Sequence, residues 1–380
     1  MLINIRNFAV RLHATSYMNK NDITKIVLTG GPCAGKTTAL VRIIEHFTGL
    51  GYQVFTLPEI PTICIQAGVN YLTDDRQYHY EAEKATLLMQ MHIEDRFMDI
   101  ARKCGKPSIV VCDRGTMDIS TYLPEETWQA LMNDIGTNTI QLRDSRYDAV
   151  LHLVSAANGA EEFYTTATNA ARSEDVKTAR MLDIKLISAW NGHPHLRIID
   201  NSRDFENKIK AVIKEISVVM GLPALNEVQR YFLVDVTGEL PETTDSEITQ
   251  TYLKSDPGST VRLRKRGWDG SYVYTLRTKT QVSDDECIET ERKITPYQYV
   301  TMLQQADTSR QTIQKLRKTF VWEKQYFELD TFLERDDNLN ILEIAGTKDG
   351  NEIHFPPFIK VIKEVTGDPD YFNATIAKIN

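Results

Sequence analysis

The stretch Gly30-Gly31-Pro32-Cys33-Ala34-Gly35-Lys36-Thr37 decides the fold of the first half of the chain. It fits the spacing G-x-x-x-x-G-K-[ST], in which glycines let backbone N–H groups converge on phosphate oxygens. A β-branched stretch at residues 25–29 precedes it, and a helix-forming stretch follows from residue 35 to about residue 47. This context predicts a phosphate-binding P-loop in which Lys36 reaches the β- and γ-phosphates and the Thr37 hydroxyl ligates Mg²⁺.

Outward from this loop, strands and helices alternate to about residue 220. The unbroken apolar character of residues 108–112 and 149–154 is typical of a parallel sheet covered on both faces. Further strands are expected at residues 52–57 and 196–200, and a long helix between residues 75 and 104. The alternation predicts a doubly wound α/β P-loop domain with right-handed crossovers.

Charged residues follow two of these strands. Asp113 ends the strand at residues 108–112, where an aspartate holds Mg²⁺ in P-loop proteins, although a helix N-cap is the alternative reading. Arg114 is a candidate phosphate clamp or a structural arginine. Glu59 follows the strand at residues 52–57 and is either a general base or a surface acid in a turn. The predicted nucleotide-binding set is Gly30, Gly31, Pro32, Cys33, Ala34, Gly35, Lys36, Thr37, Thr38 and Asp113.

Two arginines farther along, Arg172 and Arg180, are candidates for a lid over the phosphates or for a solvated helix face. No Asn-Lys-x-Asp sequence occurs, so the residues leave the choice between GTP and ATP open. No clear catalytic glutamine follows Asp113 either. The expected cofactor is therefore Mg²⁺ with GTP or ATP, without a prediction of rapid hydrolysis.

The pattern changes after residues 221–223. Strands are expected at residues 228–236, 260–265, 272–280, 287–294, 321–329 and 339–345, separated by turn signals such as Asp256-Pro257-Gly258. This part predicts an antiparallel, barrel-like domain of the α+β class. The expected organisation is a basic tail at residues 1–22, the P-loop domain at 23–221 and the barrel-like domain at 224–380.

Basic residues alternate along two strands of the second domain, so their side chains share a face. Glutamates and aspartates alternate too, at 289 and 291 and at 328 and 330. Such a face either lines the inside of a barrel and grips a polyanion, or forms the charged outer surface of an ordinary sheet. The candidate anion-binding residues are Arg262, Arg264, Arg266, Arg277, Lys279 and Lys293, with Arg317 and Lys318 as possible additions.

Composition limits the remaining possibilities. The chain has 380 residues and a net charge of -8, which argues against a nucleic-acid-binding protein held by bulk charge. No segment is apolar enough to cross a bilayer. Five scattered cysteines disfavour a zinc site or a disulfide framework, so a cytoplasmic protein, peripheral to membranes if it meets them, is expected. The basic first twenty residues also fit a mitochondrial presequence.

Motifs in the second half resemble the CYTH, or triphosphate tunnel, superfamily. The resemblance rests on Arg262-Leu-Arg264, Tyr274-Thr-Leu-Arg277-Thr-Lys279, Leu342-Glu343-Ile344 and the segment from Glu227 to Tyr231. It implies an eight-stranded tunnel whose basic residues grip a triphosphate and whose acids, here Glu227 and Glu343, bind a divalent metal. The family's opening motif is ExExK. Here Gln229 and Tyr231 replace an acid and the lysine, which disfavours metal-dependent triphosphatase activity and leaves polyanion binding.

The first half resembles an AAA-like, kinase-like P-loop family through Asp113-Arg114 and the stretch from Asp183 to Trp190-Asn-Gly-His-Pro-His. Both domains in this order resemble a photoreceptor trafficking factor. That resemblance implies a GTP-binding protein that supports internalisation of a membrane channel with the trafficking machinery and contacts acidic phospholipids. The leading hypothesis is thus a nucleotide-binding regulator whose second domain holds an acidic ligand. A small-molecule kinase with Glu59 as base, and a metal-dependent triphosphatase, are the alternatives.

Overall fold

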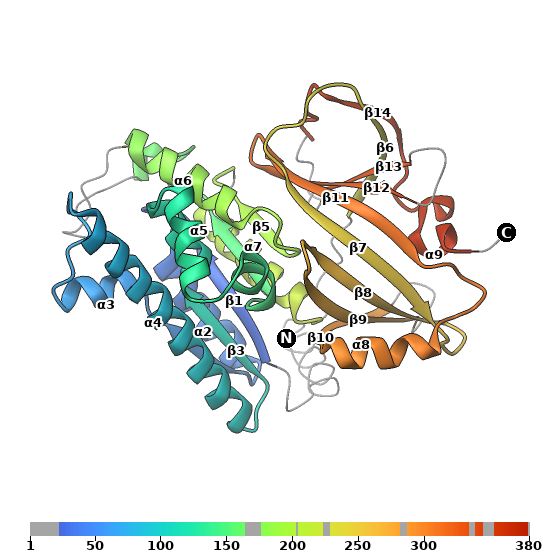
Figure 1. The fold of residues 1–380 in the computed structure, drawn as a ribbon, viewed down its shortest axis with the longest axis horizontal. Coiled ribbons are helices and arrows are strands. Elements are labelled where there is room, and N and C mark those ends of the chain that lie inside the picture. Colours follow the sequence, from blue (N-terminus) through green and yellow to red (C-terminus); the bar gives the residue numbers. More distant parts are fainter. Residues whose placement is uncertain are drawn as a thin grey trace, which may run out of the picture. The chain divides into compact units, whose positions relative to one another are not determined.

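The computed structural model describes residues 23–163, 176–202, 204–222, 229–281, 287–333, 339–344 and 353–378. The chain divides into two compact units, Met1–Ala224 and Leu225–Asn380, which are treated separately below (Figure 1). Among the described residues, no helix combines the length and the apolar character needed to span a membrane.

The first unit is built on a five-stranded sheet with the order β2-β3-β1-β4-β5. Every strand pair is parallel, so the carboxyl ends of all five strands lie at one edge. The predicted α/β parallel-sheet domain is therefore confirmed. The strands are β1 (Ile23–Thr29), β2 (Gln53–Leu57), β3 (Ser108–Asp113), β4 (Ala149–Leu153) and β5 (Leu196–Ile199). The helices are α2 (Lys36–Gly49), α3 (Ile60–Gln66), α4 (Arg76–Lys103), α5 (Glu125–Asp134), α6 (Val176–Trp190) and α7 (Phe205–Val219).

The core of this unit lies between the sheet and α2 and α7. Ala39, Ile43 and Phe47 of α2 recur at a spacing of four residues and are fully buried against apolar residues of β1, β3 and β4. Fully burying one large apolar side chain contributes about 1.5–3 kcal/mol, so this interface fixes α2, and with it the loop at its N-terminus, to the sheet.

Two local features of the first unit were not predicted. Helix α3 begins directly after β2, and Pro61 lies in its first turn, where the missing N–H costs nothing. Residues Ile140–Ser145 form a π-helical turn that the sequence pattern does not reveal.

The second unit is a nine-stranded antiparallel sheet with the order β10-β9-β8-β7-β11-β12-β13-β6-β14. The long strands β7, β8, β9 and β11 run across the unit in Figure 1. The described residues include no pairing between β10 and β14 that would close the sheet, so the barrel stays a prediction. The strands are β6 (Arg230–Val236), β7 (Thr244–Leu253), β8 (Ser259–Trp268), β9 (Ser271–Gln281), β10 (Cys287–Ile294), β11 (Ile313–Trp322), β12 (Gln325–Phe332), β13 (Asn340–Ile344) and β14 (Ile359–Glu364).

The prediction of a single strand at residues 321–329 is wrong. This segment is the hairpin between β11 and β12, with Glu323 and Lys324 at the turn, and both residues have positive φ angles. Two consecutive residues with positive φ are typical of the tight turns that join antiparallel strands, usually with Asn or Gly. Strand β7 was also absent from the expected set.

Candidate functional site

The P-loop connects β1 to α2 at the carboxyl edge of the parallel sheet. Gly30 has a φ of 137°, and a Cβ there would lie 2.1 Å from the Leu153 carbonyl oxygen, so only glycine fits. Gly35 caps α2 with a φ of 89°. Thr37 and Thr38 are exposed at the start of α2, where N–H groups and the helix dipole favour an anion.

A buried aspartate from α6 fixes the loop. The Asp183 carboxylate accepts hydrogen bonds from Gly31 N at 2.9 Å and from Ser155 N at 3.3 Å, and its Oδ1 lies 3.1 Å from His152 Nε2. Burial opposes ionisation of Asp183, but His152 and these N–H groups outweigh it and lower its pKa. Sequence reasoning did not find this role, because the contact spans about 150 residues of chain.

Lys36 is enclosed by its own loop. Its Nζ donates hydrogen bonds to Gly30 O at 2.8 Å and to Gly31 O at 3.3 Å. Burial and the nearby Arg114 guanidinium lower the pKa of Lys36 to about 8, against the opposing fields of Asp113 and Glu59. The ammonium therefore sits in a site whose carboxylates only partly offset the positive charge.

Asp113 lies at the end of β3, beside Leu28 of β1. Its Oδ1 is buried without a hydrogen-bond partner in the described part of the chain, and burial raises its pKa. An orphaned carboxylate oxygen in the field of Lys36, the residue before Thr37, fits the oxygen ligands that Mg²⁺ prefers. Thr37 and Asp113 are therefore the residues that would hold Mg²⁺ with a nucleotide.

Glu59 and Arg114 form an ion pair across the carboxyl ends of β2 and β3. Burial opposes ionisation of Glu59, but Arg114 outweighs it and lowers the pKa of Glu59. Arg114 has a φ of 70°, an uncommon conformation for a residue with a side chain, and its Nη1 is buried without a partner among the described residues. The pair brings a fixed carboxylate and a spare guanidinium donor to the phosphate loop.

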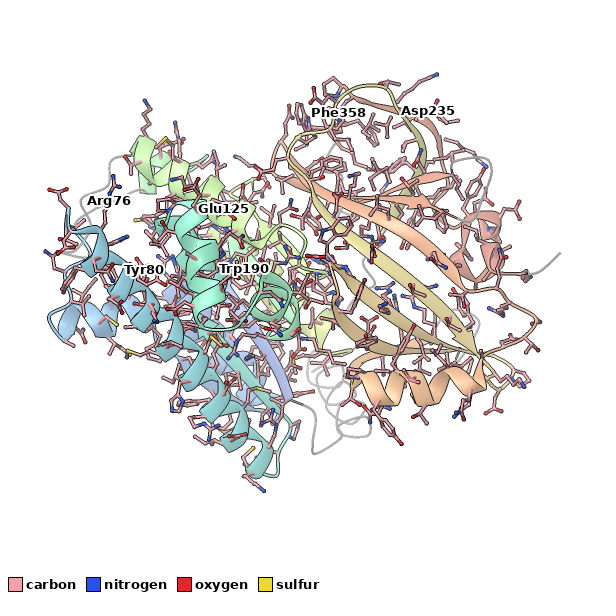
Figure 2. All side chains as sticks on the ribbon, viewed as in Figure 1. Arg76, Tyr80, Glu125, Trp190, Asp235 and Phe358 are labelled. Carbon is pink, nitrogen blue, oxygen red and sulfur yellow. The ribbon has the colours of Figure 1, made fainter. Side chains whose placement is uncertain are left out.

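Asp118 connects the strand edge to α6 and was not anticipated. It accepts hydrogen bonds from Thr29 Oγ1, from Gly115 N at 2.8 Å and from Trp190 Nε1 at 2.9 Å. Trp190, labelled in Figure 2, is fully buried at the end of α6. Asp118 therefore holds the segment after Arg114 in place.

Of the two lid candidates, Arg172 lies outside the described residues. Arg180 lies on α6, where its Nε donates to Ala157 O at 2.5 Å and its guanidinium pairs with Glu161. This arrangement ties α6 to the loop after β4. A role over the phosphates stays a prediction.

In the second unit, the strand register places the candidate cations on one face of the sheet. Arg262 lies opposite Arg277, and Arg264 lies opposite Gln250 of β7. The same face continues through β11 to β13, where Arg317 lies opposite Asp330, and Glu328 opposite Glu343. We call this set of side chains the charged face; its members are Arg262, Arg264, Arg277, Arg317, Glu328, Asp330 and Glu343.

Arginines crowd one end of the charged face. Arg262 Nε and Nη2 and Arg264 Nε are buried and have no hydrogen-bond partner among the described residues. Burial, together with Arg264 and Arg277, lowers the pKa of the Arg262 guanidinium to about 9. Buried donors without acceptors cost about 1–3 kcal/mol each, and a multiply charged anion would satisfy them.

Other predicted anion ligands differ in position. Lys279 and Lys293 are exposed. Lys318 is on the opposite face of β11, where its Nζ pairs with Asp245 at 2.6 Å, so its inclusion was wrong because strand residues alternate in direction. Glu227 lies outside the described residues. Tyr231 OH donates to Gln229 Oε1 at 2.7 Å and lies 3.4 Å from Glu343 Oε1.

Taken together, the folds and sites define a P-loop nucleotide-binding domain joined to an antiparallel domain with an arginine-rich face. Comparison with known proteins agrees: the AAA domain family matches residues 25–208. The inorganic triphosphatase of Acetivibrio thermocellus is 31% identical over 129 residues, which are 34% of this chain and 78% of that protein. Through this segment the chain belongs to the family of that triphosphatase.

Two solved structures are also similar. One is an inorganic triphosphatase, with 28% identity and a TM-score of 0.31 over 40% of this chain and 95% of that chain. The other is deoxyadenosine kinase from M. mycoides with bound dATP, with 15% identity and a TM-score of 0.36 over 51% of this chain and 99% of that chain.

Proposed function

We propose that this protein is a nucleotide-binding regulator with two phosphate sites: the P-loop holds a magnesium nucleotide, and the charged face holds a separate polyanion. The observation that carries this proposal is the set of buried, unpartnered donors of Arg262 and Arg264 in a chain that also has a complete P-loop. Thr37 and Asp113 would hold Mg²⁺, which would offset the negative charge of the phosphates. Lys36 and the N–H groups of the loop bind and orient the phosphates.

Removing Lys36 tests the nucleotide site. Lys36→Ala loses charge-assisted hydrogen bonds worth about 1.5–3 kcal/mol, so the affinity for GTP and ATP should fall roughly 10- to 150-fold. Binding of both nucleotides is measured by calorimetry in the presence of Mg²⁺, and the two titrations also give the base preference. Exposed Lys210→Ala serves as the matched control. Wild-type affinity in Lys36→Ala would contradict the nucleotide site.

The finer assignment follows the family resemblance: GTP as the nucleotide, acidic phospholipid headgroups as the polyanion, and membrane-protein trafficking as the process. The charged face supports the headgroup because arginine donors bind the phosphate esters of lipids as they bind polyphosphates. Retention of the protein on vesicles containing phosphatidylserine is compared with its retention on neutral vesicles and with its binding of free tripolyphosphate. This comparison shows whether the phosphate comes from a lipid headgroup or from a free polyphosphate. Equal retention on neutral vesicles would contradict phospholipid recognition.

A second candidate function, a small-molecule kinase, is favoured by the Glu59–Arg114 ion pair beside Lys36. In this reaction Glu59 takes the proton of an acceptor hydroxyl while that oxygen bonds to the terminal phosphorus. The bridging P–O bond then breaks and a nucleoside diphosphate leaves. Arg114 holds Glu59 and offers its spare donor to the transferred phosphoryl group.

Screening nucleosides and small alcohols with labelled ATP and GTP tests this candidate. Glu59→Gln should lower transfer about 100-fold or more while leaving nucleotide affinity within a few-fold of wild type. A protein that binds nucleotide and transfers to none of the acceptors would count against the kinase.

A further inference from the structure

The carboxylates of the charged face are already occupied by a cation of the chain itself. Arg317 Nε donates to Asp330 Oδ1 at 2.6 Å, and its Nη2 donates to Asp330 Oδ2 at 2.7 Å and to Glu343 Oε2 at 3.1 Å. Its Nη1 pairs with Glu328. One guanidinium thus contacts three carboxylates from β12 and β13, among them Glu343, which the family resemblance implies as a ligand of a divalent metal.

A second cation completes this cluster. Lys315 is 2% exposed and also pairs with Asp330, so both oxygens of Asp330 are used. Burial opposes the charge of Asp330, but Arg317 and Lys315 outweigh it and lower its pKa. Burial also opposes the charge of Arg317, and the carboxylates raise its pKa well above the ordinary value. Arg317 and Asp330 therefore stay ionised as a pair, whereas burial lowers the pKa of Lys315 to about 8.

The remaining polar atoms do not make up a metal site. Glu328 Oε1 has no hydrogen-bond partner in the described residues, and Glu328 Oε2 pairs with Arg317. Gln229 and Tyr231 contribute neutral groups beside Glu343. Mg²⁺ in proteins is held by one or two carboxylates together with phosphate oxygens, and Arg317 already contacts all three carboxylates of this cluster. No group of three or more ligands that could hold a metal ion exists among the residues that the structure describes. The described residues therefore do not fit the metal, and Glu227 lies outside them.

We propose that the second unit binds its polyanion without a divalent cation, because Arg317 occupies the space among the carboxylates as a fixed internal counter-ion. Arg262 and Arg264 are then left to the ligand, since their buried donors face no carboxylate partner in the described part of the chain. This inference rests on the proposed polyanion site and adds that the site is independent of Mg²⁺ and Mn²⁺.

The test is calorimetric titration of tripolyphosphate into the full-length Lys36→Ala protein, in which the P-loop contribution is reduced. Affinity with EDTA should lie within about threefold of the affinity with millimolar Mg²⁺ or Mn²⁺. Binding that disappears in EDTA and returns with metal would overturn the inference while leaving the polyanion site intact. No binding under any condition would instead overturn the polyanion site, and the inference with it.

Arg317 variants sharpen the result. Arg317→Gln leaves three carboxylates near the ligand without their counter-ion, so like-charge repulsion should lower tripolyphosphate affinity in EDTA at least tenfold, and added Mn²⁺ should restore it. Arg317→Lys keeps one charge and should retain most of the affinity. Direct Mn²⁺ binding, followed by electron paramagnetic resonance on the Lys36→Ala protein, gives a readout even if Arg317→Gln fails to fold. A tightly bound Mn²⁺ in the second unit would contradict the internal counter-ion.

Discussion

At the residue scale, Lys36 sets the pH range over which the P-loop holds phosphate. Its pKa lies at about 8 because the ammonium is buried in its loop and close to Arg114. Below that pH the side chain is charged and donates to phosphate. Above it, the protein without nucleotide loses the proton and must regain it to bind.

Nucleotide affinity should therefore fall as pH rises through about 8, approaching about tenfold per pH unit at higher pH. The measurement is calorimetric titration of Mg-GTP and Mg-ATP across this range. Lys36→Ala, which has no ammonium to titrate, should lack this fall. A flat profile for the wild type up to the ordinary lysine pKa would contradict the argument.

Which residues could be found from sequence depends on how local their contacts are. The loop from Gly30 to Thr37 is contiguous, so its spacing alone indicates its chemistry. Glu59 and Arg114 were recognised separately at two strand ends, but only the fold pairs them. Asp183 acts across 152 residues of chain, and no spacing in the sequence signals such a contact. The partners of Arg317 are 11 to 26 residues away, but the hairpin that brings them together was not predicted.

At the element scale, α6 packs closely against the segment after β3. A Cβ added to Gly115 would lie 2.8 Å from Trp190 Cζ2 and 2.9 Å from Val27 Cγ2, closer than real Cβ contacts allow. Neither neighbour can yield easily, because Trp190 and Val27 are fully buried. The backbone at Gly115 therefore sets the distance between α6 and the sheet.

Gly115→Ala should destabilise the first unit by about 1–3 kcal/mol through this overpacking. Gly49→Ala is the matched control: no atom lies within 4 Å of its added Cβ, and alanine favours the helix, so little change or slight stabilisation is expected. Hydrogen exchange in increasing denaturant, resolved by peptide, measures the effect in each unit. Equal stability of the two variants would show that the contact is not tight.

Elements with a strong apolar period were predictable, and those defined by turns were not. The helix expected between residues 75 and 104 is α4, Arg76–Lys103, capped by the Asp75 side chain. The turn at Glu323 and Lys324 contains neither glycine nor proline, so the two strands that it joins were merged. Strand β7 was missed because polar residues, including buried Ser246 and Gln250, alternate along it.

At the scale of the whole molecule, two units with separate cores carry the two proposed anion sites. Apolar residues of the parallel sheet, α2 and α7 form one core, and the antiparallel sheet has cores of its own. Each site is built within its own unit: Lys36, Asp113 and the Glu59–Arg114 pair in the first, and Arg262 and Arg264 in the second. Loss of one site should therefore leave the other chemically complete.

The most direct test of two separate phosphate sites is a cross-titration of two variants with two ligands. Mg-nucleotide is titrated into two proteins, the Lys36→Ala variant and the double variant Arg262→Gln/Arg264→Gln. Tripolyphosphate is then titrated into Lys36→Ala and into the triple variant that combines all three substitutions. We predict that nucleotide affinity falls only with Lys36→Ala and that the remaining tripolyphosphate affinity falls at least tenfold with the arginine substitutions. Tripolyphosphate binding that vanishes in Lys36→Ala alone, with no effect of the arginine substitutions on any ligand, would contradict the second site.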